Sequence, residues 1–321
     1  MWLRLWFLPA IAVVSVIAWA LPAPIPGGDW WRDAATVAVF VVQGLALPQA
    51  TLRSAVLAWR PALRIHLLGF VLAPILALGL AAGLRALGVD EGVARGLIVT
   101  AVLPTTITSC VAYTALAGGA TAISLVNVVA SSIAGVLLAP VLAAWLAGGH
   151  GALDPLGAMQ HLAVVVLVPF AIGQLLRAQP LGAGAAAWCE RHGGQAAQAC
   201  LLVILLVVLG EALHRGQPPP GSALALGAVA ALVLHAALAA AAWWSAASLP
   251  RGERLAVLFT ASHKSASLGV PLVAVLYAGD PAKSAILAPV LAYHLLQLLL
   301  DAPLAVRLGG GRSAAPAAGG S

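Results

Sequence analysis

The sequence predicts an all-α polytopic membrane protein with ten transmembrane helices in two inverted five-helix repeats. Of its 321 residues, 62% are hydrophobic and 8% are charged, whereas a soluble domain carries about a quarter charged residues. The mean hydropathy of +1.02 is an average over the whole chain, so the apolar excess is not confined to one anchor. The two halves also echo each other in sequence. These observations exclude a soluble enzyme, a nucleic-acid binder and a secreted domain stapled by disulfides.

Charged and Gly/Pro-rich breaks separate ten apolar stretches, each near the ~20 residues with which a helix crosses a bilayer. They are residues 3–21, 34–52, 65–84, 93–117, 121–147, 158–176, 196–213, 222–248, 253–278 and 284–306. The first has a basic residue before its apolar core, like a signal peptide, but it lacks a small-residue cleavage site, so we expect a retained helix. The stretches predict one transmembrane unit over 1–307 and a disordered cytoplasmic tail over 308–321.

The basic residues predict the orientation of these spans. With the N-terminus inside, ten Lys/Arg residues lie on the inner side and five on the outer side, which favours both termini in the cytoplasm. The net charge of +6 comes from these dispersed residues and not from a basic run, so it does not indicate nucleic acid. Three cysteines without a CxxC motif indicate neither disulfides nor zinc.

An internal repeat relates residues 3–147 to residues 158–306. The matches, at an offset of about 160 residues, are Pro9 with Pro169, Thr100-Ala101 with Thr260-Ala261, and Ala139-Pro140 with Ala302-Pro303. Because each half holds five spans, an odd number, the second half enters the membrane in the opposite sense. Inverted repeats are a transporter architecture with a site near the middle of the membrane. A helical bundle without a transport role is the alternative.

Two corresponding spans, the fourth and the ninth, contain polar interruptions. In the fourth, Pro104 removes a backbone donor and clashes with the preceding turn, among five hydroxyl residues. In the ninth, Ser262-His263-Lys264-Ser265 interrupts the apolar run. Backbone groups freed at membrane depth must line a cavity or be buried in protein, and half-helix ends offer dipoles to ions. The alternative for any single hydroxyl is a bond back to its own helix.

Lys264 is the most informative single residue, because a cation near the bilayer centre costs about 2.5 to 3.5 kcal/mol even on lenient scales. Three roles remain open: it neutralises an anionic substrate, it carries a coupling proton, or it stands in for a coupling cation. His263, His294 and Gln297 are candidates to share a proton or bind a ligand. We expect His66 and His235 to be structural or interfacial residues.

Several motifs resemble the bile acid:sodium symporter superfamily, and specifically its symporter-like branch. They are Val41-Val42-Gln43-Gly44-Leu45, Leu103-Pro104-Thr105-Thr106, Ser109-Cys110-Val111-Ala112-Tyr113-Thr114, Ala117-Gly118-Gly119, Asn127, Pro169-Phe170-Ala171-Ile172-Gly173-Gln174-Leu175-Leu176-Arg177, Ser262-His263-Lys264-Ser265, Leu268-Gly269-Val270-Pro271, and Tyr293-His294 with Gln297. The resemblance covers residues 3–306. It implies a panel domain and a core domain, with the broken fourth and ninth helices crossing in the core.

Carried over by position, the resemblance implies a sodium site and also departures from it. Ser109 and Cys110 stand where well-known sodium-coupled members present a Ser-Asn ligand pair, Ser124 matches a hydroxyl ligand, and Asn127 lies one turn beyond. The Glu expected near Ser262 is absent, as are a Gln near Ala266 and another at Gly69. Glu211 and Asp301 are placed near span ends, so no acidic residue is expected at mid-depth. The resemblance therefore implies at most one weak sodium site, at Ser109, Ser124 and Asn127.

The sequence thus predicts a secondary transporter of the bacterial inner membrane that moves a small organic anion by alternating access, driven by sodium or protons. The predicted site residues are Thr106, Thr108, Ser109, Cys110, Ser124, Asn127, Ser262, His263, Lys264, Ser265, His294 and Gln297. The sequence predicts no cofactor, and Na⁺ enters only as a candidate coupling ion. Three alternatives remain: a non-transporting regulator of calcium or other ions, an intramembrane enzyme, and a metalloid efflux carrier. No metal-binding carboxylate pair or activated nucleophile supports the enzyme.

Overall fold

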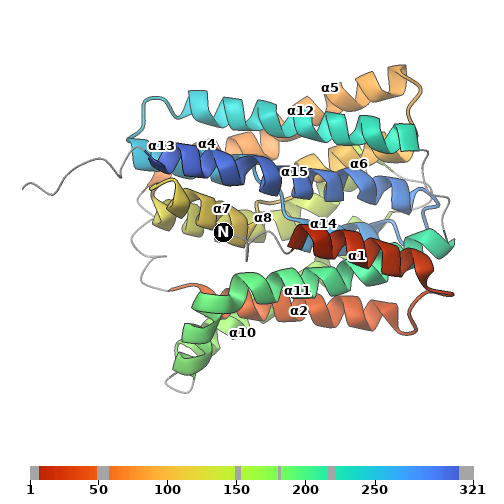
Figure 1. Cartoon of the computed structure of the whole chain (residues 1–321), viewed down its shortest axis with the longest axis horizontal. Helices are drawn as coiled ribbons and strands as arrows, with labels where there is room; N and C mark the ends of the chain where they lie inside the picture. Colours follow the sequence, from red (N-terminus) through yellow and green to blue (C-terminus); the bar gives the residue numbers. More distant parts are fainter. Residues whose placement is uncertain (1–6, 49–57, 149–152, 180–181, 216–220, 311–321) are drawn as a thin grey trace, which may run out of the picture.

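The computed structural model describes residues 7–48, 58–148, 153–179, 182–215 and 221–310, and these residues form helices and no strand (Figure 1). The helices are α1 (Phe7–Ala20), α2 (Gly28–Ala46), α4 (Trp59–Leu67), the π-helix η2 (Leu68–Leu72), α5 (Ala73–Ala86), α6 (Glu91–Val102), α7 (Ile107–Leu116), α8 (Thr121–Leu146), α9 (Pro155–Leu162), the π-helix η3 (Ala163–Leu167), α10 (Val168–Arg177), α11 (Ala183–Arg215), α12 (Gly221–Ser245), α13 (Arg251–Ser262), α14 (Ala266–Leu276) and α15 (Lys283–Gly309).

Six helical segments are long and apolar enough to cross a membrane, and the bent pair α6–α7 makes a seventh. The six are Trp59–Ala86, Thr121–Leu146, Pro155–Arg177, Ala183–Glu211, Gly221–Ser245 and Lys283–Gly309. Three other predicted spans differ from these for physical reasons. α1 has only 14 described residues, and α2 carries charged residues near its start. The ninth predicted span is divided into α13 of 12 residues and α14 of 11 residues. The chain is a multi-pass membrane protein.

Helix boundaries differ from the predicted spans where polar residues occupy the ends of helices. α2 begins at Gly28 and not at residue 34, because Asp29 and Asp33 hold Arg32 within its first turns. α11 begins at Ala183, thirteen residues before the predicted start at 196. α15 continues to Gly309, so the helix includes the first residues of the expected tail. The rest of that tail, 311–321, lies outside the described residues.

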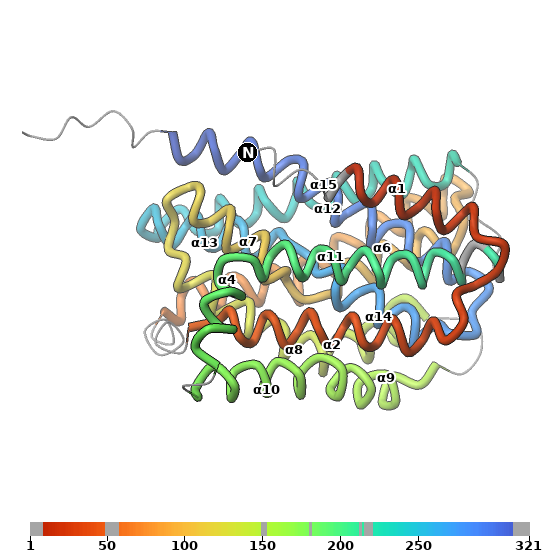
Figure 2. The backbone as a smooth tube through the Cα atoms, turned by 60° about the horizontal axis from the view of Figure 1, so that its bottom comes forward, coloured from red at the N-terminus to blue at the C-terminus, as the bar shows by residue number. Residues whose placement is uncertain are grey.

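Two spans contain one π-helical turn each, and each turn ends two residues before a proline. η2 comes before Pro74 and η3 before Pro169. A proline inside a helix has no N–H and its ring crowds the preceding turn, and a π turn is a local widening that accommodates such a defect. Figure 2 shows that α9 and α10 still run as one continuous rod across η3.

The helices form two groups, which we name the panel group and the core group. The panel group consists of α1, α2, α9 to α10 and α11, with α11 and α10 packed along α2. The core group consists of the remaining helices, and Figure 1 shows α12, α13 and α15 above α2, α10 and α11. Gly44 of α2 lies against the backbone of Phe170 and Gly173 in α10, so a side chain there has no room. In the core group, α6 is buried from Gly92 to Val102.

Candidate functional site

The two broken helices meet inside the core group. α6 and α7 are bent by 62° at a break that runs from Leu103 to Thr106, and α13 and α14 are interrupted at residues 263–265. The N–H of Ser265 donates a 2.8 Å hydrogen bond to the carbonyl of Pro104, which joins one break to the other. The ends of four half-helices therefore converge on one buried point.

Different sequence features stop α6 and α13. Pro104 has no N–H, and the N–H of Leu103 turns back to Thr100. α13 ends without a proline, at the extended residue His263. There the side chain of Gln297 takes the place of a backbone partner. Its Oε1 accepts from the N–H of Lys264 at 2.8 Å, and its Nε2 donates to the carbonyl of the same residue at 3.0 Å.

Lys264 is a buried residue, 3% exposed. Its side chain points to main-chain oxygens. Its Nζ donates to the carbonyls of Ala101 at 2.6 Å, Gly69 at 2.7 Å and Leu103 at 3.0 Å. All three ammonium protons thus have acceptors. This geometry disfavours the role of neutralising an anionic substrate, because no proton of the ammonium is left to bind one.

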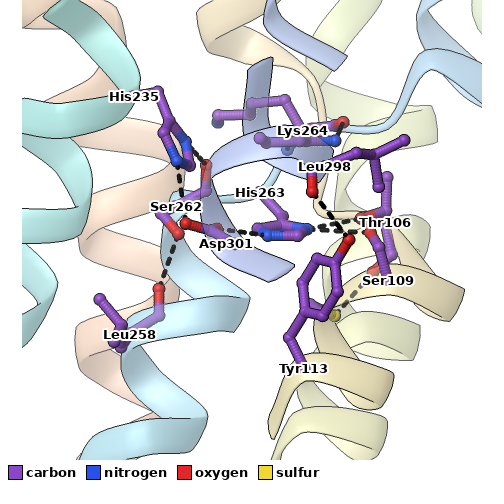
Figure 3. Close-up of polar contacts among 12 residues, drawn as sticks. Thr106, Ser109, Tyr113, His235, Leu258, Ser262, His263, Lys264, Leu298 and Asp301 are labelled. Carbon is purple, nitrogen blue, oxygen red and sulfur yellow. Dashed lines mark hydrogen bonds and ion pairs between the residues drawn. The ribbon is translucent and has the colours of Figure 1, made fainter. Parts of the chain in front are cut away.

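A buried carboxylate lies at the α13 break, shared between two histidines (Figure 3). Asp301 accepts from His263 at 2.7 Å and from His235 at 3.2 Å. The prediction that Asp301 lies near a span end was wrong. α15 extends beyond it to Gly309, and the residue is 2% exposed. His235, which we expected to be structural or interfacial, is buried, and its ring contacts this carboxylate.

Hydroxyl groups of α7 complete this polar chain. Nδ1 of His263 lies 2.9 Å from the hydroxyl of Ser109 and 3.2 Å from that of Thr106, which are 2.6 Å from each other. The ring of Tyr113 stands edge-on to His263 at 5.6 Å. A histidine between a carboxylate and hydroxyls that either donate or accept is suited to take up and release a proton.

The remaining predicted residues do not form one group. Ser124 hydrogen-bonds the hydroxyls of Thr114 and Thr260 at 2.9 Å each, while the amide of Asn127 bonds its own helix at Ile123. Among the hydrogen bonds of the described residues, none joins Ser109 to Ser124 or Asn127. The other predicted residues have separate surroundings. Cys110 donates to the carbonyl of Thr106, and Ser262 donates to the carbonyl of Leu258. Thr108 faces Gly194 of α11, Ser265 is buried at the break, and His294 accepts from Gln297.

Sequence reasoning missed three participants in the site. These are Asp301, His235 and the carbonyl of Gly69. A signal existed for the first two, because a carboxylate and a histidine in apolar helices are costly unless paired. The carbonyl of Gly69 had no signal in the sequence beyond the nearby Pro74.

A helical membrane protein with two broken helices meeting at a buried polar site belongs to the class of membrane transporters. The chain is a member of the SBF-like CPA transporter family, whose profile matches residues 5–309. This membership bears out the resemblance to the bile acid:sodium symporter superfamily. It identifies a transporter family and not a family of enzymes. It does not favour the alternative of a non-transporting regulator of calcium or other ions.

Curated relatives match nearly the full length of the chain. An uncharacterized protein of Pseudomonas aeruginosa is 29% identical over 97% of this chain and 96% of its own. A candidate symporter of Escherichia coli, YfeH, is 27% identical over 94% of this chain and 92% of its own. Sodium/bile acid cotransporter 7 of Mus musculus is 25% identical over 93% of this chain and 91% of its own.

Proposed function

We propose that the protein is a secondary active transporter that moves a small organic anion by alternating access, coupled to a sodium or proton gradient. The observation that carries this proposal is the contact between the two breaks, where the N–H of Ser265 bonds Pro104. Each break combines the end of one half-helix with the start of another. Half-helix N-termini favour an anion and half-helix C-termini favour a cation.

The proposed architecture is ten transmembrane helices in two inverted five-helix repeats. Support comes from the positions of the breaks, because His263 follows Leu103 by the same 160 residues that relate the sequence matches. The panel group and the core group then correspond to the panel and core domains. Alternating access in such folds is a rocking of one bundle against the other. We place both termini in the cytoplasm of the bacterial inner membrane.

The anion would bind at the N-terminal ends of α7 and α14. Both helices begin beside buried hydroxyl residues, Thr106 and Ser265. Backbone N–H groups at a helix start are ready donors to a carboxylate or sulfonate. The name of the mouse relative makes a bile acid the first anion to test.

Two coupling ions remain, and each has its own residues. A proton would be held by His263, which is supported by the 2.7 Å contact with Asp301. Sodium prefers oxygen ligands and would be bound by Ser109, Ser124 and Asn127. For sodium the support is weaker, because Ser124 is already bonded to Thr114 and Thr260, and the amide of Asn127 to its own helix.

The test is flux in proteoliposomes that contain the purified protein. We expect radiolabelled taurocholate, or a smaller aliphatic or aromatic anion offered in parallel, to accumulate when an inward proton or sodium gradient is imposed. Comparing the two gradients identifies the coupling ion, and protein-free liposomes give the background. Failure of every anion to accumulate or exchange under either gradient contradicts the proposed function.

A further inference from the structure

We propose that the ammonium of Lys264 is a tethered cation, which permanently occupies a cation position built from the carbonyls of Gly69, Ala101 and Leu103. Without the lysine ammonium, a set of carbonyls of this kind would bind a free monovalent cation such as sodium. The consequence for coupling rests on the proposed function. The occupancy of the position by the ammonium does not rest on the proposed function, because it concerns only the folded protein.

The three oxygens have lost their helical partners through two prolines. The carbonyl of Ala101 would pair with the N–H of Thr105 in a continuous helix, but that N–H donates to the hydroxyl of Ser131 at 3.1 Å. This change follows from the break at Pro104. The α6 end thus leaves carbonyls at its C-terminus, where the helix dipole is negative.

Gly69 loses its partner in the π turn η2. The N–H of Ala73 bonds the carbonyl of Leu68, one residue back from its α-helical partner. The same π pattern would pair the carbonyl of Gly69 with residue 74, and Pro74 has no N–H to give. An oxygen freed in the middle of one span therefore lies within reach of the same Nζ as two oxygens freed at the break of another.

The charge state of Lys264 follows from the same geometry. Three carbonyl oxygens lie between 2.6 and 3.0 Å from Nζ. A carbonyl accepts only, so each contact requires a proton on nitrogen, and an ammonium has three while a neutral amine has two. The face of Phe70 lies 5.9 Å from Nζ and adds a further favourable contact for a cation.

A set of main-chain oxygens at the end of a broken helix is also how transporters coordinate Na⁺. Lys264 thus supplies from within the chain the charge that sodium would bring from solution. In a transporter, a fixed charge cannot enter and leave with each cycle. Coupling to an ion is then left to another group.

The test uses Lys264→Ala, which removes three carbons and the nitrogen and opens the position. Thermal unfolding of purified protein is measured at equal ionic strength in choline chloride, sodium chloride and propylammonium chloride, since propylammonium has the shape of the deleted atoms. We expect the variant to unfold several degrees below the native protein in choline. Sodium or propylammonium should raise its Tm by more than either raises that of the native protein.

Two further variants complete the test. Lys264→Met keeps the volume of the side chain without its charge, so neither sodium chloride nor propylammonium chloride should restore its Tm. Should Lys264→Ala fail to fold in every salt, Lys264→Ser takes its place, because its short side chain also leaves the position open and its hydroxyl places a polar group beside the freed carbonyls. Equilibrium binding of ²²Na⁺ should then show one more bound sodium than in the native protein. The proposal is overturned if salt raises the Tm of the alanine variant no more than that of the native protein. Where the serine variant replaces it, equal ²²Na⁺ binding does the same. Neither readout uses a transported anion, so failure here is distinct from failure of the flux experiment.

Discussion

Asp301 divides its two carboxylate oxygens between His263 and His235, one oxygen to each ring. The other nitrogen of His235 lies 3.3 Å from the carbonyl of Ser262. Both neighbours of His235 are then acceptors while Asp301 is ionised, so each ring nitrogen faces a fixed acceptor. His263 differs, because hydroxyls on its far side adapt to either of its protonation states. The partners of His235 are thus fixed, which leaves His263 as the variable group.

Replacing Asp301 with asparagine should therefore affect both stability and coupling. The change removes the carboxylate that both imidazoles contact inside the protein, and loss of one partner of a buried pair costs about 3 to 5 kcal/mol. We expect a lower Tm and loss of proton-driven accumulation, with exchange of anion across the membrane retained. Both are measured on the same reconstituted protein.

Glu190→Gln serves as the matched control for this prediction. Glu190 pairs with Arg177 at 2.5 Å, but its side chain is 44% exposed, so its removal should cost no more than about 1 kcal/mol. If the asparagine variant retains the native Tm and full proton-driven accumulation, Asp301 has no role in coupling.

At the level of whole elements, the sequence predicted the two breaks but not the means by which they are held. Pro104 ends α6 for a reason visible in the sequence. At the second break the decisive group is Gln297, which lies 33 residues beyond Lys264 and meets it only through folding. The position of Asp301 was misjudged in the same way. Its depth depends on where α15 ends, and helix ends are poorly marked in a chain so rich in Ala and Leu. Tertiary partners of this kind have no local pattern.

The break in α6 also depends on a close contact with α8. A Cβ added at Gly135 would lie 2.5 to 2.7 Å from three ring atoms of Pro104, which is closer than real contacts allow. Gly135→Ala should therefore displace Pro104 and lower stability by about 1 to 3 kcal/mol, as overpacking of a core does. Thermal unfolding measures the change, and transport should fall with it because the crossing of the helices shifts.

Gly79→Ala is the matched control within α5. A Cβ there meets nothing within 4 Å, and alanine favours a helix over glycine by about 1 kcal/mol. We expect this variant to be as stable as the native protein or slightly more so. A Gly135→Ala variant that behaves in the same way would show that the break does not depend on contact with α8.

At the scale of the whole molecule, the fixed charge and the variable group lie in the core group, and the panel group faces them. Lys264 and His263 are neighbours in sequence, yet their side chains diverge to different partners, three carbonyls for one and a carboxylate for the other. Lys264 is then a constant cation, and the adjacent His263 is the group proposed to gain and lose a proton. This arrangement suits a proton-coupled cycle without exchangeable sodium at the Lys264 position. Such a cycle still requires the two groups of helices to move.

A cross-link between the two groups tests that movement. Thr108 of α7 and Gly194 of α11 face each other, with 3.6 Å between the methyl carbon of Thr108 and a Cβ built at Gly194. In a protein whose native cysteines are replaced, a cysteine pair at these positions should form a disulfide under oxidation. That disulfide should stop gradient-driven flux, and reduction should restore it.

The control pair is Val42 with Gly193, at 3.0 Å between the corresponding atoms and within the panel group. Its cross-link should leave flux unchanged. Full flux through the oxidised Thr108–Gly194 pair would show that the groups do not move relative to each other at this contact.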